Sequence, residues 1–286
     1  QPLDLDPQGW QAGREGKRRP RAVVVGGSVH DLSGRPGHDM CLQLGTSVPG
    51  QLTSCMGGVG KNVAEGLAKL GCETTLISAV GKDVPGQAIL DECTQLGIKT
   101  QGVAVRKDLP TATYLCILDE EGNLHTAIAD MDVLDTIDED IIRAHRTTIL
   151  EADVVVADCN LSNSALRTLA GLCRAHDRPL LFEPTSEPKA SRVVDAGVLG
   201  QVSLLTPNLG ELIAIARSLG HYTSEGCRLL QEAIAQGDLL HLRPYLYTVL
   251  QQMIQRAPTS PSPHQVEGDD SASASCPPPP ASHHVV

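Results

Sequence analysis

The sequence GGVGKN at residues 57–62 has the clearest potential for chemistry in this chain. Its glycines let the backbone approach a ligand closely. The run also opens a predicted helix, where free amide groups attract polar or anionic groups. Asn62 carries an amide that both donates and accepts, which suits a diol. The spacing matches neither the phosphate loop GxxxxGK[ST] nor the dinucleotide fingerprint GxGxxG. A tight turn needed only for packing is the alternative interpretation.

Four other polar residues are candidates, and each has a structural alternative. Asp31 follows the first predicted strand and could cap a turn, while Lys189 could be a solvated surface lysine. Asn208 suits the first position of the helix predicted after it, and Glu211 would complete a capping box. Such a cap does not exclude a further role, so this pair does not discriminate by itself. The ten histidines show no HxxxH or HExxH spacing and are interpreted as surface or turn residues.

The elements that must hold these residues alternate between strand and helix. Short apolar runs bounded by turn residues predict strands, and apolar residues at helical spacing predict helices closed by glycine. Such alternation favours a parallel sheet covered on both faces, with Asp158 and Cys159 at the end of a buried strand. The predicted strands are 22–28, 74–81, 152–159, 179–185 and 203–208, and the predicted helices are 61–70, 87–97, 141–152, 163–176 and 209–220.

The segment 112–130 breaks this alternation, because it predicts two strands around a polar turn at 119–123. The turn is too polar for a central strand pair, so we expect a small antiparallel flap. Residues 40–58 are also strand-like, with glycine and proline between the apolar residues. They could therefore pair with the flap.

Composition limits the class of protein. The chain has 286 residues, a formal net charge of −11, 41% hydrophobic residues and 2% aromatic residues, so its core must be aliphatic. The chain has no run of 18 apolar residues, so its sequence predicts no membrane span. Its acidic balance argues against binding nucleic acid. Nine scattered cysteines without a CxxC pair indicate reduced thiols in a cytoplasmic type of protein.

The two ends of the chain differ from its middle. Residues 1–21 are polar and basic, which predicts a disordered linker or tail, with a nuclear or mitochondrial signal as the alternative. Residues 221–256 predict two helices, and the Pro/Ser-rich residues 257–286 predict a disordered tail. The chain begins with Gln1 rather than Met, which suggests a processed protein or a fragment.

The run GGVGKNVAEGLAKLGCETTLISAVG at 57–81 resembles the amino-terminal signature of the PfkB (ribokinase-like) sugar and nucleoside kinases. The similarity covers roughly residues 22–220 and continues in one order through SAVGKDVPGQAIL, TATYLCILDEEGNL, AIADMDV, VVVADCNLS, FEPTSEPKA and LTPNLGEL. Within that family the blocks look most like the pseudouridine kinases. The resemblance implies an α/β fold, with a Rossmann-type α/β/α core of three layers in a partial kinase domain at 22–256. It also implies a small β lid from about 40–56 and 111–130.

The resemblance further implies an activity, the transfer of phosphate from ATP, with Mg²⁺, to the 5′-hydroxyl of pseudouridine. Asp31, Gly58 and Asn62 look like the sugar contacts, and the role of Lys189 stays open. The implied substrate-binding residues are Asp31, Gly58, Asn62, Thr113, Asp130 and Lys189, and the implied magnesium-binding residues are Asn208 and Glu211.

Kinases of this family end with a second signature, a Gly-Ala-Gly-Asp-like loop that supplies an anion hole and the catalytic base. No such loop occurs in the chain, and the nearest string, EGDD at 267–270, lies in the predicted tail. We therefore expect a domain truncated at its carboxy-terminal side, with an incomplete ATP site and essentially no turnover alone. The alternatives are a non-catalytic nucleoside-binding module, a homodimer paired through the lid, and a fragment of a glycosidase–kinase fusion.

Overall fold

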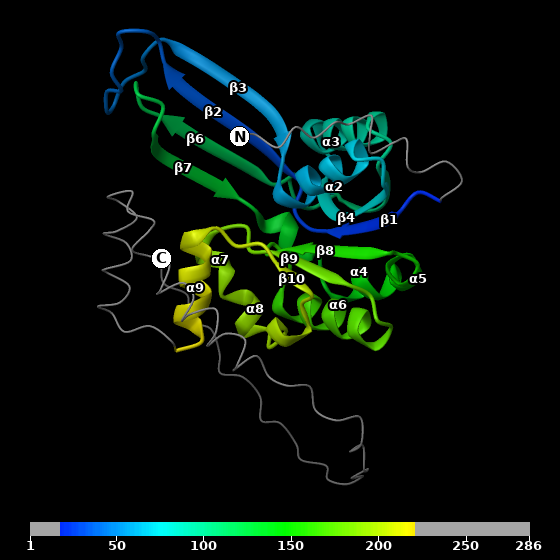
Figure 1. The fold of residues 1–286 in the computed structure, drawn as a ribbon. Helices are drawn as coiled ribbons and strands as arrows, with labels where there is room; N and C mark the ends of the chain where they lie inside the picture. The colour runs from blue at the N-terminus through cyan, green and yellow to red at the C-terminus, as the bar shows by residue number, and fades with distance from the viewer. Residues whose placement is uncertain (1–17, 221–286) are drawn as a thin grey trace, which may run out of the picture.

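A six-stranded sheet lies at the centre of the computed structural model, which describes residues 18–220 (Figure 1). The strand order is β10-β9-β8-β1-β4-β5, and every neighbouring pair is parallel. This confirms the parallel sheet predicted from the alternation of elements. The strands are β1 (Arg21–Val25), β4 (Glu73–Gly81), β5 (Lys99–Arg106), β8 (Val154–Asp158), β9 (Leu180–Glu183) and β10 (Leu204–Leu205).

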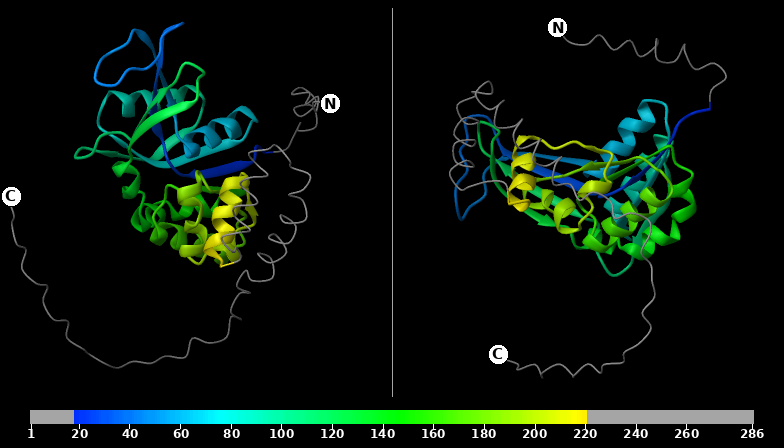
Figure 2. Two further views of the ribbon diagram at one scale, coloured as in Figure 1. Left: turned by 90° about the vertical axis from the view of Figure 1, so that its left-hand side faces the viewer. Right: turned by 60° about the horizontal axis from the view of Figure 1, so that its bottom comes forward.

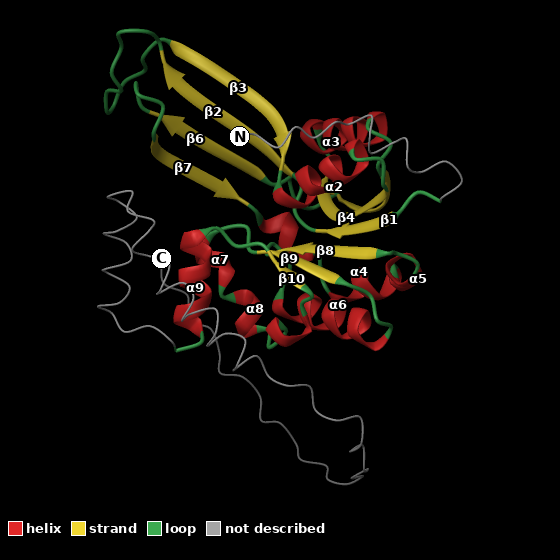
Figure 3. Cartoon of the chain, viewed as in Figure 1, coloured by secondary structure: helices red, strands yellow, loops and turns green. Residues whose placement is uncertain are grey.

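Helices cover both faces of this sheet, which makes it the middle layer of three (Figures 1 and 3). On one face lie α2 (Val59–Lys69) and α3 (Val84–Gln95), which pack against β1, β4 and β5. The opposite face is covered by the remaining described helices. These are η1 (Asp132–Thr136), α4 (Glu139–Ala144), α5 (Arg146–Leu150), α6 (Asn163–Ala175), α7 (Glu187–Ala190), α8 (Arg192–Asp195), η2 (Leu199–Gln201) and α9 (Leu209–Ser218).

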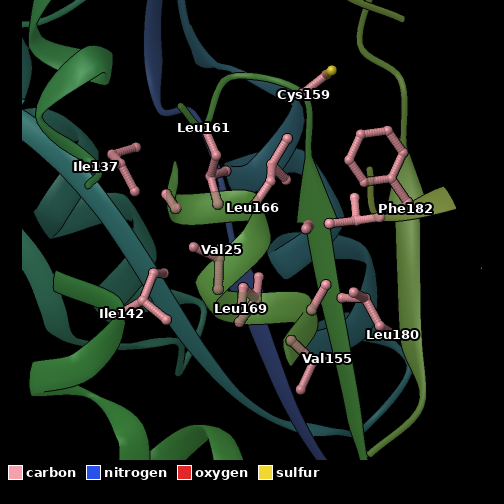
Figure 4. Packing of buried hydrophobic residues seen from close by; sticks show 14 of the residues in the cluster. Val25, Ile137, Ile142, Val155, Cys159, Leu161, Leu166, Leu169, Leu180 and Phe182 are labelled. Carbon is pink, nitrogen blue, oxygen red and sulfur yellow. The ribbon is translucent and has the colours of Figure 1, made fainter. Parts of the chain in front are cut away.

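The core is aliphatic, as the composition requires. Alternate residues of each parallel strand enter the two interfaces, so Val23 and Val25 face α6 while Val24 faces α2. Figure 4 shows the larger cluster, where Leu166 and Leu169 lie near Val25 and Val155. Each fully buried side chain of this size stabilises the fold by about 1.5–3 kcal/mol relative to an exposed one.

A second, four-stranded sheet forms the lid, which projects from the body in every view (Figures 1 and 2). Its order is β3-β2-β6-β7, and β2 pairs antiparallel with β3 but parallel with β6. The lid strands are β2 (Val29–Pro36), β3 (Gly50–Gly57), β6 (Thr113–Leu118) and β7 (Leu124–Asp130).

The lid therefore differs in part from the predicted flap. The expected hairpin within 111–130 is present as β6 and β7, but residues 40–49 form no strand and the sheet is mixed rather than purely antiparallel. Its second strand, β2, was not predicted. The sequence VHDLSGRP hides this strand because its charged residues, glycine and proline interrupt any alternation of apolar residues.

Smaller differences concern element boundaries. The predicted helix 141–152 divides at His145 into α4 and α5, and the unpredicted β5 is a partly exposed edge strand. The end of the predicted tail 1–21 contacts the body, because the Arg18 guanidinium donates two hydrogen bonds to Asp153, of 2.7 and 2.5 Å. The helices predicted in 221–256 and the tail predicted at 257–286 lie outside the described residues.

Two further observations concern residues 18–220 alone. Their seven cysteines are all free thiols. None of their helices combines the length and the apolar composition that crossing a membrane would require.

Candidate functional site

The candidate residues converge on the edge of the large sheet where its parallel strands end. Ligands of open α/β sheets bind beyond this edge. Here β1 ends at Val25 and leads through Gly26, Gly27 and Ser28 into the lid strand β2. The lid strand β3 leads directly into α2, so the base of the lid and the start of α2 meet at the end of β1.

Asp31 lies in the lid strand β2, paired with Cys55 of β3, and not in a turn. Its carboxylate is so close to Gly57 that any side chain there would collide with Asp31 Oδ2 and would lie 4.0 Å from Asn62 Nδ2. The structure therefore brings together three predicted features, namely the carboxylate of Asp31, the glycine run and the amide of Asn62. Burial raises the pKa of Asp31, against the opposing charges of His30 and Lys61.

The other glycines of the run serve packing. Gly58 has a φ of 93°, and a Cβ there would lie 2.6 Å from the carbonyl oxygen of Gly27. A Cβ at Gly60 would lie 2.8 Å from the Cα atom of Gly26. The packing interpretation thus explains Gly58 and Gly60, while Gly57 permits the close approach of the Asp31 carboxylate.

Lys61 has a structural role despite its place in the glycine-rich run. Its side chain is buried, and its ammonium donates to Met56 O at 2.8 Å, Glu65 Oε2 at 2.9 Å and Glu92 Oε1 at 2.5 Å. Burial lowers the pKa of Lys61, but the bonds to Glu92 and Glu65 outweigh it and raise the pKa overall. The lysine joins β3, α2 and α3, with no donor left over for a phosphate.

Asp158 closes the floor of the site. Its carboxylate, only 1% exposed, accepts four hydrogen bonds of 2.8–2.9 Å, from the amides of Gly27, Gly60 and Asn160 and from Asn160 Nδ2. Burial raises the pKa of Asp158, and these bonds oppose the shift. The group ties together the ends of β1 and β8 and the start of α2.

Lys189 is not a solvated surface lysine. It is partly buried, and its ammonium donates to Asn160 Oδ1 at 2.6 Å. Burial lowers the pKa of Lys189, and the positive charge of Arg192 lowers it further. Asn160 was not among the predicted site residues. Its position directly after a buried strand that ends in an aspartate is the signal that could have identified it.

Thr113 and Asp130 lie at the base of the lid, paired with each other across β6 and β7. Thr113 also pairs with His30, so pleating places both side chains on the His30 face of the sheet, opposite Asp31. The residue in register with Asp31 on β6 is Tyr114, which packs against the main core. The structure thus brings Tyr114, rather than Thr113 or Asp130, onto the Asp31 face.

Asn208 and Glu211 form the capping box that their spacing predicts. Glu211 N donates to Asn208 Oδ1 at 2.9 Å, and Asn208 N donates to Glu211 Oε2 at 2.8 Å. Burial raises the pKa of the neighbouring Glu183, and the charge of Glu211 contributes to the rise. Within 18–220, no three His, Cys, Asp or Glu side chains gather in a way that could hold a metal ion.

Comparison with known proteins adds to this geometry. The family model for the pfkB family carbohydrate kinases matches residues 20–241. The pseudouridine kinase of Escherichia coli (strain K12) is 36% identical over 186 residues, covering 65% of this chain and 58% of that protein. The pseudouridine kinase of Arabidopsis thaliana is 30% identical over 198 residues, covering 69% of this chain and 50% of that protein. The chain thus spans only half to three fifths of the length of these relatives.

Solved structures show the same fold. A carbohydrate kinase from Agrobacterium tumefaciens superposes with a TM-score of 0.63 and 30% identity, covering 75% of this chain and 67% of that one. The Arabidopsis thaliana ribokinase complexed with ribose and ATP gives a TM-score of 0.59 at 20% identity, covering 77% of this chain and 68% of that one.

Proposed function

Because the chain belongs to the pfkB family of carbohydrate kinases, we propose that residues 18–220 form the nucleoside-binding part of a kinase that phosphorylates the 5′-hydroxyl of pseudouridine from ATP. The observation that carries the proposal is the meeting of Asp31, Gly57 and Asn62 at the base of the lid. The Asp31 carboxylate can accept hydrogen bonds from two sugar hydroxyls, and the Asn62 amide can donate to one of them. Gly57 lacks a Cβ that would collide with Asp31 Oδ2, so it permits the position of this carboxylate.

ATP and a divalent metal come with the family. Mg²⁺ is held by one or two carboxylates, several waters and substrate phosphates, and it neutralises phosphate charge when bound. The donors of this chain fit that pattern, because Glu211 lies close to Glu183 and its negative charge contributes to the raised pKa of Glu183. We assign Glu211 as the group that would hold the metal through water, with Asn208 fixing its orientation through the capping box.

Transfer itself requires a base and an anion hole. The 286 residues contain no Gly-Ala-Gly-Asp-like loop. We therefore propose that this polypeptide alone binds the nucleoside without transferring phosphate.

A second copy of the chain is the proposed partner of the lid. The lid face opposite Asp31 carries Thr113 and Asp130 at its base and an aliphatic patch farther along the strands, and we call this patch the outer lid face. Leu52 on this face is 86% exposed and Ile128 is 68% exposed, which is unusual for large aliphatic side chains gathered on one sheet. The outer lid face consists of Leu32, Leu52, Leu115, Ile117 and Ile128.

The test is a titration of the full 286-residue chain with pseudouridine, followed by calorimetry and by the melting temperature. We expect binding by the wild type and a loss of at least about tenfold in affinity for Asp31→Asn, since a hydrogen bond to a charged group contributes about 1.5–3 kcal/mol. Asp39→Asn is the control, because Asp39 is exposed near the tip of the lid and asparagine tolerates its φ of 62°. A folded wild type that does not bind pseudouridine would contradict the proposal. An Asp31→Asn variant with unchanged affinity for pseudouridine would contradict it as well. If phosphorylated pseudouridine forms when ATP and Mg²⁺ are added, the proposal that this polypeptide alone transfers no phosphate is wrong.

A further inference from the structure

Lys189 and Asn160 form a pair that neither the glycine run nor the capping box explains. The Lys189 ammonium has three N–H groups, and among the described residues only Asn160 Oδ1 accepts one of them. Asn160 is fixed in turn, because its amide nitrogen donates to Asp158 Oδ2 at 2.9 Å. The lysine is therefore held in one place, partly buried, with two N–H groups that lack an acceptor within 18–220.

The pair lies in the same site as Asp31. A Cβ at Gly27 would lie 2.7 Å from Asn160 Nδ2, and a Cβ at Gly58 would lie 2.6 Å from the carbonyl oxygen of Gly27. A continuous row of backbone and side chains thus leads from Asp31 through the glycines to Asn160. A ligand that placed hydroxyls on Asp31 could extend its other end toward Lys189.

The surrounding charges favour a neutral acceptor at Lys189 over a phosphate. Arg192 acts on the lysine as a positive charge, and Asp158 and Asp135 act on it as negative charges. With the charge of Lys189 itself, two positive and two negative charges balance, so a polyanion would add negative charge that these groups do not compensate. A carbonyl oxygen accepts hydrogen bonds from an ammonium without adding a full negative charge. Asp31 and Asn62 already provide for the hydroxyls of the sugar, which leaves the base.

We propose that Lys189, positioned by Asn160, binds a carbonyl oxygen of the nucleobase and so makes the site select a carbonyl-bearing nucleoside over a free sugar. This inference rests on the proposed function and adds a specificity-determining residue to it. Lys189 touches the ligand, whereas Asn160 acts by orienting Lys189.

The experiment compares two ligands that share the sugar, pseudouridine and ribose, by calorimetry with the full chain. We expect Lys189→Met to lower the affinity for pseudouridine at least tenfold and to leave the affinity for ribose unchanged. The control is Lys82→Met, because Lys82 is an exposed lysine at the end of β4. As a third ligand, a C-riboside with a phenyl ring in place of the base lacks the carbonyls. We expect the wild type to bind it no better than Lys189→Met binds pseudouridine.

The outcomes that contradict the inference can be distinguished from one another. An equal loss for pseudouridine and ribose would assign Lys189 a structural role and overturn the inference, as would an unchanged affinity for pseudouridine. If Lys189→Met does not fold, Lys189→Gln provides the same comparison with a shorter neutral donor, and the same selective loss is expected. A wild type that binds ribose and pseudouridine equally overturns this inference alone. A wild type that binds neither overturns the proposed function as well.

Discussion

At the scale of single residues, the buried polar groups divide by whether their hydrogen-bonding capacity is used. Lys61 has three acceptors and Asp158 has four donors, so both hold the fold together. Asp31, in the lid strand β2, and Lys189, in the short helix α7, have few partners. Sequence position alone does not separate the two groups, because Lys61 stands within the very run that was predicted to bind ligand.

Replacing Asp158 tests whether a buried polar group whose hydrogen-bonding capacity is used holds the fold together. Asp158→Ala leaves the amides of Gly27, Gly60 and Asn160 buried without an acceptor, so we expect a loss of about 3–5 kcal/mol in unfolding free energy. Chemical denaturation measures this loss. The exposed Asp91→Ala is the control and should change stability by less than about 0.5 kcal/mol. A tolerated Asp158→Ala would show that the network does not hold the floor of the site.

The raised pKa of Asp31 predicts how binding depends on pH. The carboxylate accepts hydroxyl hydrogen bonds best when ionised, so affinity for pseudouridine should fall as the pH drops through the raised pKa, above the ordinary value of about 3.9. Calorimetry between about pH 7.5 and 4.5 measures this, and Asp31→Asn should give a flatter profile. Equal slopes in the two proteins would assign the titration to another group.

The same group acts on stability with the opposite sign. Its folded pKa exceeds its unfolded pKa, so its contribution is fully present below the unfolded value and is lost as the pH rises through the folded one.

At the scale of elements, the lid depends on how β6 is fixed to the body. Asp83 caps α3 by accepting from Gly86 N at 2.9 Å, and it also accepts from the amide and the hydroxyl of Thr111, at 2.8 and 2.5 Å. Gly81 N donates to the same hydroxyl at 2.9 Å. One carboxylate therefore joins the start of α3, the end of β4 and the segment that enters β6.

Asp83→Ala should therefore do more than remove a helix cap. Loss of a cap costs about 1 kcal/mol, and the lost bonds to Thr111 should also speed amide exchange in β6. Asp138→Ala is the matched control, because Asp138 caps α4 through Asp140 N and Ile141 N and makes no hydrogen bond to the lid within residues 18–220. Hydrogen exchange followed by mass spectrometry should show faster exchange at 111–118 in Asp83→Ala only. Equal exchange there in both variants would contradict this role.

How much of this could be predicted from the sequence differs between elements. The apolar runs of β1, β4 and β8 are buried on both faces. That these segments are strands, and their order along the chain, therefore follow from composition. The lid strand β2 has no such pattern, because its stability comes from pairing with β3 and β6. Asp31 was therefore expected after the first strand, where it could cap a turn, and not within a strand. Tyr114 was missed because only the assembled register places it opposite Asp31, whereas Asn160 follows a buried strand that ends in an aspartate, which is a signal that the sequence does carry.

At the scale of the whole molecule, the lid has two unlike faces. One face carries Asp31 and Tyr114 toward the body. On the outer lid face, Leu52 and Ile117 flank Gly34, since a Cβ at that glycine would lie 3.2 Å from each of their methyl groups. The sheet is thus polar at the site and aliphatic on its outside. A sheet with one apolar and one polar face is typically covered on its apolar face.

The outer lid face gives the prediction for the whole molecule. If a second copy covers it, Leu52→Glu places two charges in an apolar interface, where burial of an unpaired charge is strongly unfavourable. We expect the wild type to be a dimer by light scattering after gel filtration, and Leu52→Glu to be a folded monomer. Leu70→Glu is the matched control, because Leu70 is 66% exposed at the end of α2, outside the lid, and its variant should remain a dimer. A monomeric wild type would contradict the proposal that a second copy of the chain covers the outer lid face. Loss of the dimer in both variants would place the interface elsewhere. An interface through the outer lid face should be disrupted by Leu52→Glu and not by Leu70→Glu.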